Sequence, residues 1–227
     1  YATYTDGDKE KAHITDYNGT DWNLTIPKTL TVEGKEIPVG RISGFSKNKN
    51  ITSLTIEDGA IVEIGEKAFQ GCPNLKTVSL PSGTTFGVRK QSESSIIHNG
   101  YNFEGCKSLT ELTLGDGITI LPEHVFENCT SLKSVRLPSK LNCFENSAFA
   151  GCTSLTTLEI PEGVEGMGRA AFEGCISLTQ VTIPSSIKRW CITEHLEYSN
   201  HAQFQNSAFN NCTSLEQINL SEGLTAI

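Results

Sequence analysis

Two glutamates and two histidines near the C-terminus have the chemistry to bind a metal ion. Glu194, His195, Glu197 and His201 lie within one eight-residue segment. Such side chains bind zinc when their spacing directs them to one point, but this spacing matches no known ligand motif. The pattern therefore predicts no metal site, and we expect no cofactor.

Nucleophilic catalysis by a Cys–His pair is the second chemistry to consider. His98 or His195 could approach Cys143 or Cys191, two cysteines that lie outside the regular cysteine positions described below. A thiol becomes a catalytic nucleophile when a base and an orienting group are held beside it, and nothing in this sequence orients such a pair. The chain also contains no glycine-rich phosphate loop and no paired-carboxylate motif. The sequence therefore favours a protein that is not an enzyme.

The other six of the eight cysteines recur at one position of a repeated segment, Phe-x-x-Cys-x-x-Leu-x-x-Val-x-Leu-Pro. The central anchors are 23 residues apart, and spacings of 34 and 37 residues mark insertions of 11 and 14 residues, near 85–98 and 188–203. A fixed period of about 20–30 residues indicates a solenoid, which displays surface rather than enclosing an active site. The anchor pairs are Phe69 and Cys72, Phe103 and Cys106, Phe126 and Cys129, Phe149 and Cys152, Phe172 and Cys175, and Phe209 and Cys212.

Stacking of the coils explains these six cysteines without disulfide bonds. One cysteine per coil would form a ladder of free, buried thiols, each acting as a small hydrophobic residue. Cys143 and Cys191 are two coils apart, and a disulfide between them requires the second insertion to fold back. That pairing stays open from the sequence.

Each coil ends in a short segment that alternates apolar and polar residues, which predicts a half-buried strand. Stacked in parallel about 4.8 Å apart, these strands would form one continuous sheet. The phenylalanines, with Phe45 as a degenerate first copy, would stack into a spine that uses seven of the ten in the chain. The strand segments are 75–80, 109–114, 132–137, 155–160, 178–183 and 215–220, and Pro81, Pro138, Pro161 and Pro184 follow four of them.

The segments Ala148–Val164 and Ala171–Ile187 carry the pattern most completely, and the pattern resembles the BspA-like leucine-rich repeats of bacterial surface proteins. This resemblance covers about residues 39–227. It implies a solenoid with a parallel β-sheet on the concave face, short turns, 3-10 or irregular segments on the convex face, and no large helices. Residues 1–40 are then expected to form a lead-in or cap with a hairpin near Val32–Glu36, and residues 41–227 about seven coils that end within a repeat.

The charge and hydropathy of the chain disfavour two classes of partner, nucleic acids and the membrane interior. The net charge of −8 disfavours nucleic acid, whose phosphates are bound by clustered Lys and Arg. No apolar run approaches the ~20 residues that span a bilayer, so we expect no membrane insertion by this segment. Residues 1–6 have neither the basic region nor the apolar stretch of a signal peptide, and we interpret the chain as part of a longer protein. The resemblance implies an extracellular or cell-surface location.

Three surfaces are candidates for binding. The outward row of the expected sheet is polar, and simple exposure to solvent would also explain it; Arg136 is its one residue of a type favoured at interfaces. The insertions are the other two, because loops on rigid scaffolds often carry function, although Trp190 could instead fill the core position that Met167 fills one coil earlier. We expect adhesion to a protein or glycan of a host or neighbouring cell, or alternatively a structural spacer. The candidate ligand-binding residues are Phe86, Arg89, Arg136, Glu159, Trp190, His195 and Tyr198.

Overall fold

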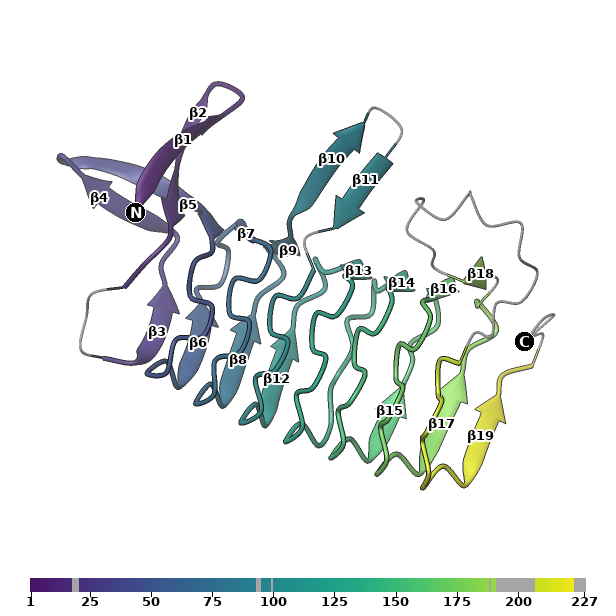
Figure 1. Ribbon diagram of the computed structural model, residues 1–227. Helices are drawn as coiled ribbons and strands as arrows, with labels where there is room; N and C mark the ends of the chain where they lie inside the picture. The colour runs from purple at the N-terminus through teal and green to yellow at the C-terminus, as the bar shows by residue number, and fades with distance from the viewer. Residues whose placement is uncertain (18–20, 93–94, 99, 188, 191–206, 223–227) are drawn as a thin grey trace.

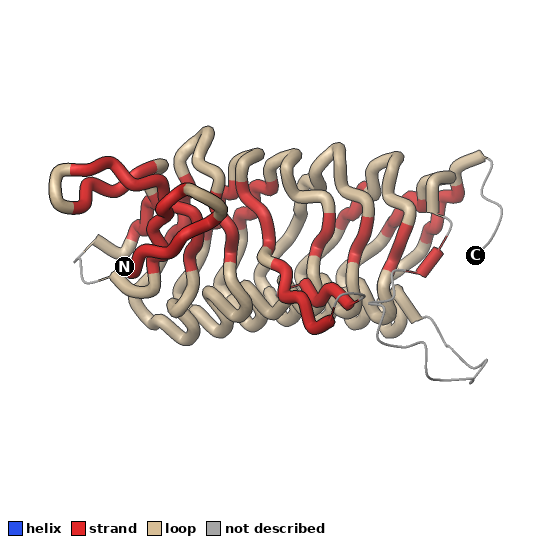
Figure 2. The backbone as a smooth tube through the Cα atoms, turned by 90° about the horizontal axis from the view of Figure 1, so that it is seen from above, coloured by secondary structure: helices blue, strands red, loops and turns tan. Residues whose placement is uncertain are grey.

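The coils stack side by side into one elongated body, as Figure 1 shows in the ribbon and Figure 2 from above. The computed structural model describes all residues except 18–20, 93–94, 99, 188, 191–206 and 223–227. Its described residues form short strands and turns and contain no helix, so none there is long and apolar enough to cross a membrane. The predicted class, a leucine-rich-repeat solenoid built on parallel strands, is confirmed.

One side of the body is a row of parallel strands, one strand per coil. Apolar side chains of these strands point into the core and polar ones point outward, so Leu54 and Ile56 are buried while Thr55 between them is exposed. We call the outward side of this row the sheet face. Its strands are β3 (Asn23–Ile26), β6 (Ser53–Ile56), β8 (Thr77–Leu80), β12 (Glu111–Leu114), β15 (Thr157–Glu159), β17 (Gln180–Ile183) and β19 (Gln217–Leu220).

The expectation of one continuous sheet is wrong, because the row divides into β3-β6-β8-β12 and β15-β17-β19. The segment 132–137 was expected to be a strand, yet it keeps only an isolated bridge between Thr113 and Arg136. After β6, β12 and β19 the next residue donates its N–H to the preceding coil, as Gly115 does to the Leu80 carbonyl at 2.7 Å. Proline has no such N–H, and 138 and 161 are both prolines. The ladder is therefore weakened on both sides of this segment.

A second parallel ladder lies across the core from the first and was not expected from the sequence. Its rungs are only two or three residues long beyond β5, which is too short to show a period-two pattern. It is interrupted once, because β9 pairs only with β7 and β13 only with β14 in the described chain. The rungs are β5 (Lys35–Ile42), β7 (Val62–Ile64), β9 (Thr84–Phe86), β13 (Ile120–Leu121), β14 (Cys143–Phe144), β16 (Gly166–Met167) and β18 (Arg189–Trp190).

Three hairpins extend this framework. β4 (Thr29–Val32) turns into β5 through Glu33 and Gly34, both with positive φ. β1 (Ala2–Asp6) and β2 (Lys9–Ile14) form a hairpin whose second strand pairs with β5, and β10 (Val88–Ser92) pairs with β11 (Ser95–His98). Figure 1 shows the β1–β2 and β10–β11 hairpins on the same side of the body, with β7 and β9 between them.

The expected phenylalanine spine is confirmed. Seven rings, from Phe45 to Phe209, stack in coil order with centroids 5.2–5.6 Å apart and interplanar angles of 22° or less. Phe144 meets Phe149 and Phe172 edge-on from the second ladder. The spine joins every coil to its neighbours through the core, so the core is continuous along the axis.

The turns that carry the spine are linked by three rows of backbone hydrogen bonds. In one row the Phe69 N–H donates to the Asn102 carbonyl at 2.8 Å. The N–H of the same peptide unit, on Phe103, donates in turn to the Val125 carbonyl of the next coil at 2.9 Å. The other two rows run beside it, and in all three the donor belongs to the earlier coil and the acceptor to the later one. His124 and the residues at the matching positions of other coils adopt positive φ, near 56°, at the start of this turn.

The cysteine ladder is confirmed for the six repeat positions. All six thiols are free, five are buried, and Cys212 in the last coil is partly exposed. Each Sγ donates to the phenylalanine carbonyl of the preceding coil, as Cys129 does to Phe103 at 3.3 Å. Cys143 differs, because it is disulfide-bonded. Cys191, the partner considered from the sequence, lies outside the described residues.

Burial of these thiols predicts a stability loss at alkaline pH. Burial raises the pKa of Cys129 from 9.0 to about 12. The unfolded chain loses this proton near pH 9 while the folded chain keeps it, so unfolding becomes easier by about 1.4 kcal/mol per pH unit between these values. Urea unfolding at pH 9 and 11 should show a loss about 2–3 kcal/mol smaller for Cys129→Ala than for the wild type. The partly exposed Cys212→Ala is the control with a smaller difference; identical losses for all three proteins would contradict the prediction.

Candidate functional site

The break in the sheet face opens a groove across three successive coils. We call it the sheet-face groove; its volume is about 870 Å³. The apolar side chains of the broken rungs form its floor, where Leu137 and Leu158 are 7% and 5% exposed, whereas Leu80 and Leu54 at the matching positions of earlier coils are fully buried. It is lined by Ser134, Val135, Arg136, Leu137, Ser139, Thr157, Leu158, Glu159, Ile160, Pro161, Glu162, Gln180 and Thr182.

The groove brings together two residues singled out from the sequence. Arg136 and Glu159 are both exposed and both line it. Neither forms an ion pair with a described residue, so the guanidinium and the carboxylate are free to meet a ligand. With hydroxyl and amide groups from Ser134, Thr157 and Gln180 around them, the groove offers donors and acceptors of both charges. Such an arrangement suits recognition of a polar ligand.

A turn at the groove's edge is fixed by a carboxylate of the preceding coil. Asp116 accepts hydrogen bonds from the backbone N–H of Ser139 at 2.8 Å and from its hydroxyl at 2.9 Å. These two bonds, with the nearby Lys140 and Arg136 charges, hold the pKa of Asp116 below its usual value. The contact ties the coil that carries Arg136 to the coil before it, although no strand forms there.

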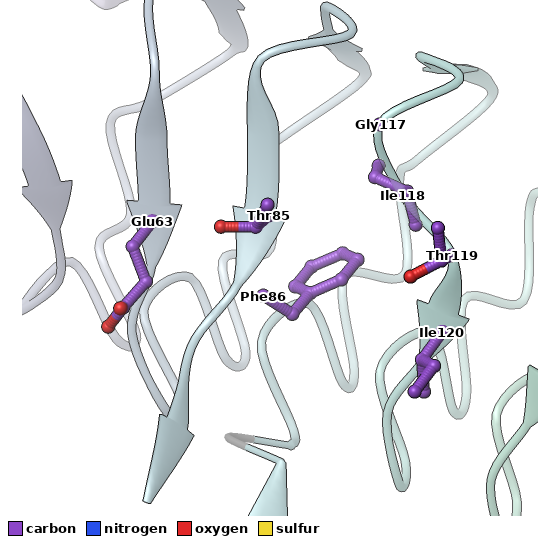
Figure 3. A pocket seen from close by; sticks show the side chains of 7 residues that line it. All are labelled: Glu63, Thr85, Phe86, Gly117, Ile118, Thr119 and Ile120. Atoms are coloured by element: carbon purple, nitrogen blue, oxygen red, sulfur yellow. The ribbon is translucent and has the colours of Figure 1, made fainter.

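A second hollow opens where the other ladder is interrupted, and we call it the ladder hollow. Its volume is about 300 Å³, and Figure 3 shows the Phe86 ring between β9 and the segment 117–120. Phe86 was expected on the projecting insertion, but it lies in β9 and is only 8% exposed. The projecting hairpin begins after it, at Val88. The hollow is lined by Glu63, Thr85, Phe86, Gly117, Ile118, Thr119 and Ile120.

The remaining sequence candidates lie in or near the two insertions. Arg89 belongs to β10. Trp190 belongs to β18 and pairs in register with Met167, the core position considered for it from the sequence. His195 and Tyr198 lie outside the described residues, as do Glu194, Glu197 and His201 of the segment weighed for metal binding.

Two histidine contacts were not predicted from the sequence. The partner of His13 is 30 residues away, and the partners of His124 lie beside it on one turn. His13 Nε2 lies 2.8 Å from the Ser43 hydroxyl, and burial followed by the charge of Arg41 lowers the histidine pKa. This pair has the spacing of a nucleophile and base, but no carboxylate of a described residue hydrogen-bonds His13 to orient it. The described residues also contain no group of three or more metal-ligating side chains.

His124 forms the other contact. Its ring hydrogen-bonds the Glu127 carboxylate at 2.5 Å and the Glu123 carboxylate at 3.2 Å, and it stacks on Tyr101 with centroids 4.4 Å apart. Burial disfavours the charged ring, yet the two carboxylates outweigh burial and raise the histidine pKa. The cluster joins two neighbouring turns, and its contacts fit a structural role.

Comparison with known proteins shows the family to which this chain belongs. The model of the BspA type leucine rich repeat region matches six copies, at residues 41–88, 90–193 and 190–227. The chain belongs to the BspA-type leucine-rich-repeat family. In this BspA-type chain the first two matched regions meet at the β10–β11 hairpin, beside the ladder hollow.

A solved structure with a TM-score above 0.5 supports the fold of this BspA-type chain. A leucine-rich repeat protein of T. pallidum is similar over 96% of this chain and 78% of its own, with 22% identity and a TM-score of 0.58. A leucine-rich repeat protein from Bacteroides ovatus shares 18% identity over 97% of this chain and 69% of its own, with a TM-score of 0.39. No relative was found among the curated proteins.

Proposed function

We propose that this chain is a non-enzymatic binding module of a secreted or cell-surface protein, and that its sheet-face groove holds a protein or glycan of a host or neighbouring cell. The observation that carries the proposal is the groove itself, where Arg136 and Glu159 form no ion pair with any residue that the structure describes. Its floor supplies apolar contact and its rim supplies hydrogen bonds, the combination that binding sites use.

The extracellular part of the proposal is supported by the disulfide at Cys143. Disulfides persist in oxidising compartments and are rare in the cytosol. The six free thiols do not oppose this location, because five are buried in the core and inaccessible to oxidants.

Charge reversal tests the groove. Glu159→Arg and Arg136→Glu are expected to lower retention on arrays of matrix proteins and glycans by about tenfold or more, since each leaves a ligand charge facing a like charge. Glu111→Arg is the matched control, because Glu111 is exposed on β12 of the same face but does not line the groove. Equal loss in the control, or no loss in the groove variants, would argue against the groove as the binding site.

A structural spacer is the second candidate function. The uninterrupted phenylalanine spine favours it, because a continuous core makes a stiff rod. If no array ligand is retained and the full-length reading frame encodes a further functional domain, the spacer is the better account.

A further inference from the structure

The interruption of the second ladder leaves two strand edges facing one another. Among the described strands, β9 pairs only with β7, and β13 only with β14. No hydrogen bond joins β9 to β13, although the turns just before them are in close contact: a Cβ on Gly117 would lie 1.7 Å from the Ser82 carbonyl oxygen. The two rungs therefore meet at the turn and separate toward the β10–β11 hairpin.

The backbone groups on these edges can be assigned from the bonds that surround them. The Val62 N–H donates to the Gly83 carbonyl and the Gly87 N–H to the Ile64 carbonyl, so alternate residues of β9 face β7. By the same alternation, the N–H and C=O of Phe86 face the opposite way, into the hollow. On β13 the Thr119 carbonyl accepts from coil residues on the far side, so the N–H and C=O of Ile120 also face the hollow.

The side chains between these edges are suited to one apolar group. Phe86 and Ile118 form the buried floor, and Thr85 and Thr119 are exposed at the rim. A closed apolar cavity of ~150 Å³ is enough to hold benzene, so an open hollow of about 300 Å³ accommodates a leucine or phenylalanine side chain. The rim charge at Glu63 already faces Arg41 at 3.3 Å.

We propose that the ladder hollow binds an extended peptide segment of a partner protein, which pairs with the open edges of β9 and β13 and inserts one apolar side chain against Phe86. Strand edges that lack partners recognise peptides through main-chain hydrogen bonds, and pockets between them select side chains. The backbone of a peptide supplies C=O and N–H groups that complement the N–H and C=O groups of Phe86 and Ile120. This site is separate from the sheet-face groove.

The test begins with peptides of about nine residues, the upper range of a single strand, selected from a random display library on the immobilised chain. Selected peptides, synthesised with blocked ends, are expected to bind Thr119→Trp about tenfold or more weakly, because the indole fills the hollow. Thr55→Trp is the matched control, an exposed threonine on β6 of the sheet face that should leave binding unchanged. Glu159→Arg should also leave it unchanged, which separates this site from the groove.

Main-chain pairing has its own signature. N-methylation along a selected peptide should weaken binding at consecutive residues of the paired segment and have little effect beyond it, because alternate N–H groups of a strand face opposite sides, one set toward β9 and the other toward β13. Failure to select any peptide, binding that survives Thr119→Trp, or an N-methyl scan without any sensitive residue would overturn the proposal. A glycan whose retention is lost in Thr119→Trp, without any peptide ligand, would also overturn it.

Discussion

Replacement of Phe126 by alanine is expected to destabilise the chain by about 3–5 kcal/mol, the usual cost of deleting a buried aromatic side chain. Phe126 is fully buried and stacks on two rings, Phe103 at 5.5 Å and Phe149 at 5.3 Å. A cavity at this position removes contacts from both neighbouring coils. The coils on either side cannot easily close it, because three rows of backbone hydrogen bonds fix their spacing.

Urea unfolding followed by tryptophan fluorescence and by circular dichroism measures this effect. In a repeat protein, loss of one interface can uncouple the two halves, so Phe126→Ala is expected to unfold in two steps where the wild type unfolds in one. Phe209→Ala is the matched control, because Phe209 is partly exposed and stacks only on Phe172 in the described chain. A larger loss in Phe209→Ala than in Phe126→Ala would contradict a spine that depends on both neighbours.

Replacement of Gly117 by alanine is expected to cost about 3 kcal/mol, the upper part of the range for overpacking. A Cβ at this position would lie 1.7 Å from the Ser82 carbonyl oxygen and 2.8 Å from its carbon. Both atoms belong to the backbone, so no side-chain rotation relieves the clash and the two coils must separate. Gly117 does not have a positive φ, and backbone strain therefore adds nothing to this cost.

Lys140→Ala provides the control for this substitution. Lys140 occupies the matching position one coil later, three residues after Leu137 as Gly117 follows Leu114, and it is exposed. Its replacement should change the free energy of unfolding by less than about 0.5 kcal/mol. Equal unfolding midpoints for Gly117→Ala and the wild type would show that the coils near the ladder hollow are not in close contact.

The repeat made the general fold predictable. One period places a phenylalanine, a cysteine and an alternating strand in every coil, and stacking follows because a single coil cannot bury them alone. The spine and the free thiols at Cys72 to Cys175 follow directly from this regularity. The second ladder was missed because rungs such as Gly166–Met167 contain no pattern that distinguishes a strand from a turn.

The two hollows were harder to predict because both depend on hydrogen bonds that are absent. Pro138 and Pro161 are visible in the sequence, but Pro81 and Pro184 follow strands that still pair with their neighbours. Proline alone therefore does not locate the break. The ladder hollow is bordered by backbone groups of Phe86 and Ile120, and backbone groups cannot be recognised from residue types in the sequence.

Some candidate residues were placed correctly from the sequence and others were not. Arg136 was singled out as the one residue of its face of a type favoured at interfaces, and Glu159 was a candidate on the same face; both line one groove. Phe86 was assigned to the projecting insertion because the period breaks there, although the chain completes a rung of the second ladder before the hairpin begins at Val88. A break in period marks the coil that contains an insertion, but not the residue at which the chain leaves the core.

The three rows of hydrogen bonds between the turns align peptide dipoles along the body. Within each row a peptide unit accepts from the coil before it and donates to the coil after it, as the Ala68–Phe69 unit does between Phe45 and Asn102. Peptide dipoles of about 3.5 D thus align along the stacking axis, as they do in an α-helix. Their positive direction runs along the axis toward β19, and their negative direction toward the first coils. Whatever stacks on the turn of the last described coil, a further coil or a partner chain, is therefore expected to present carbonyl or carboxylate oxygens to it.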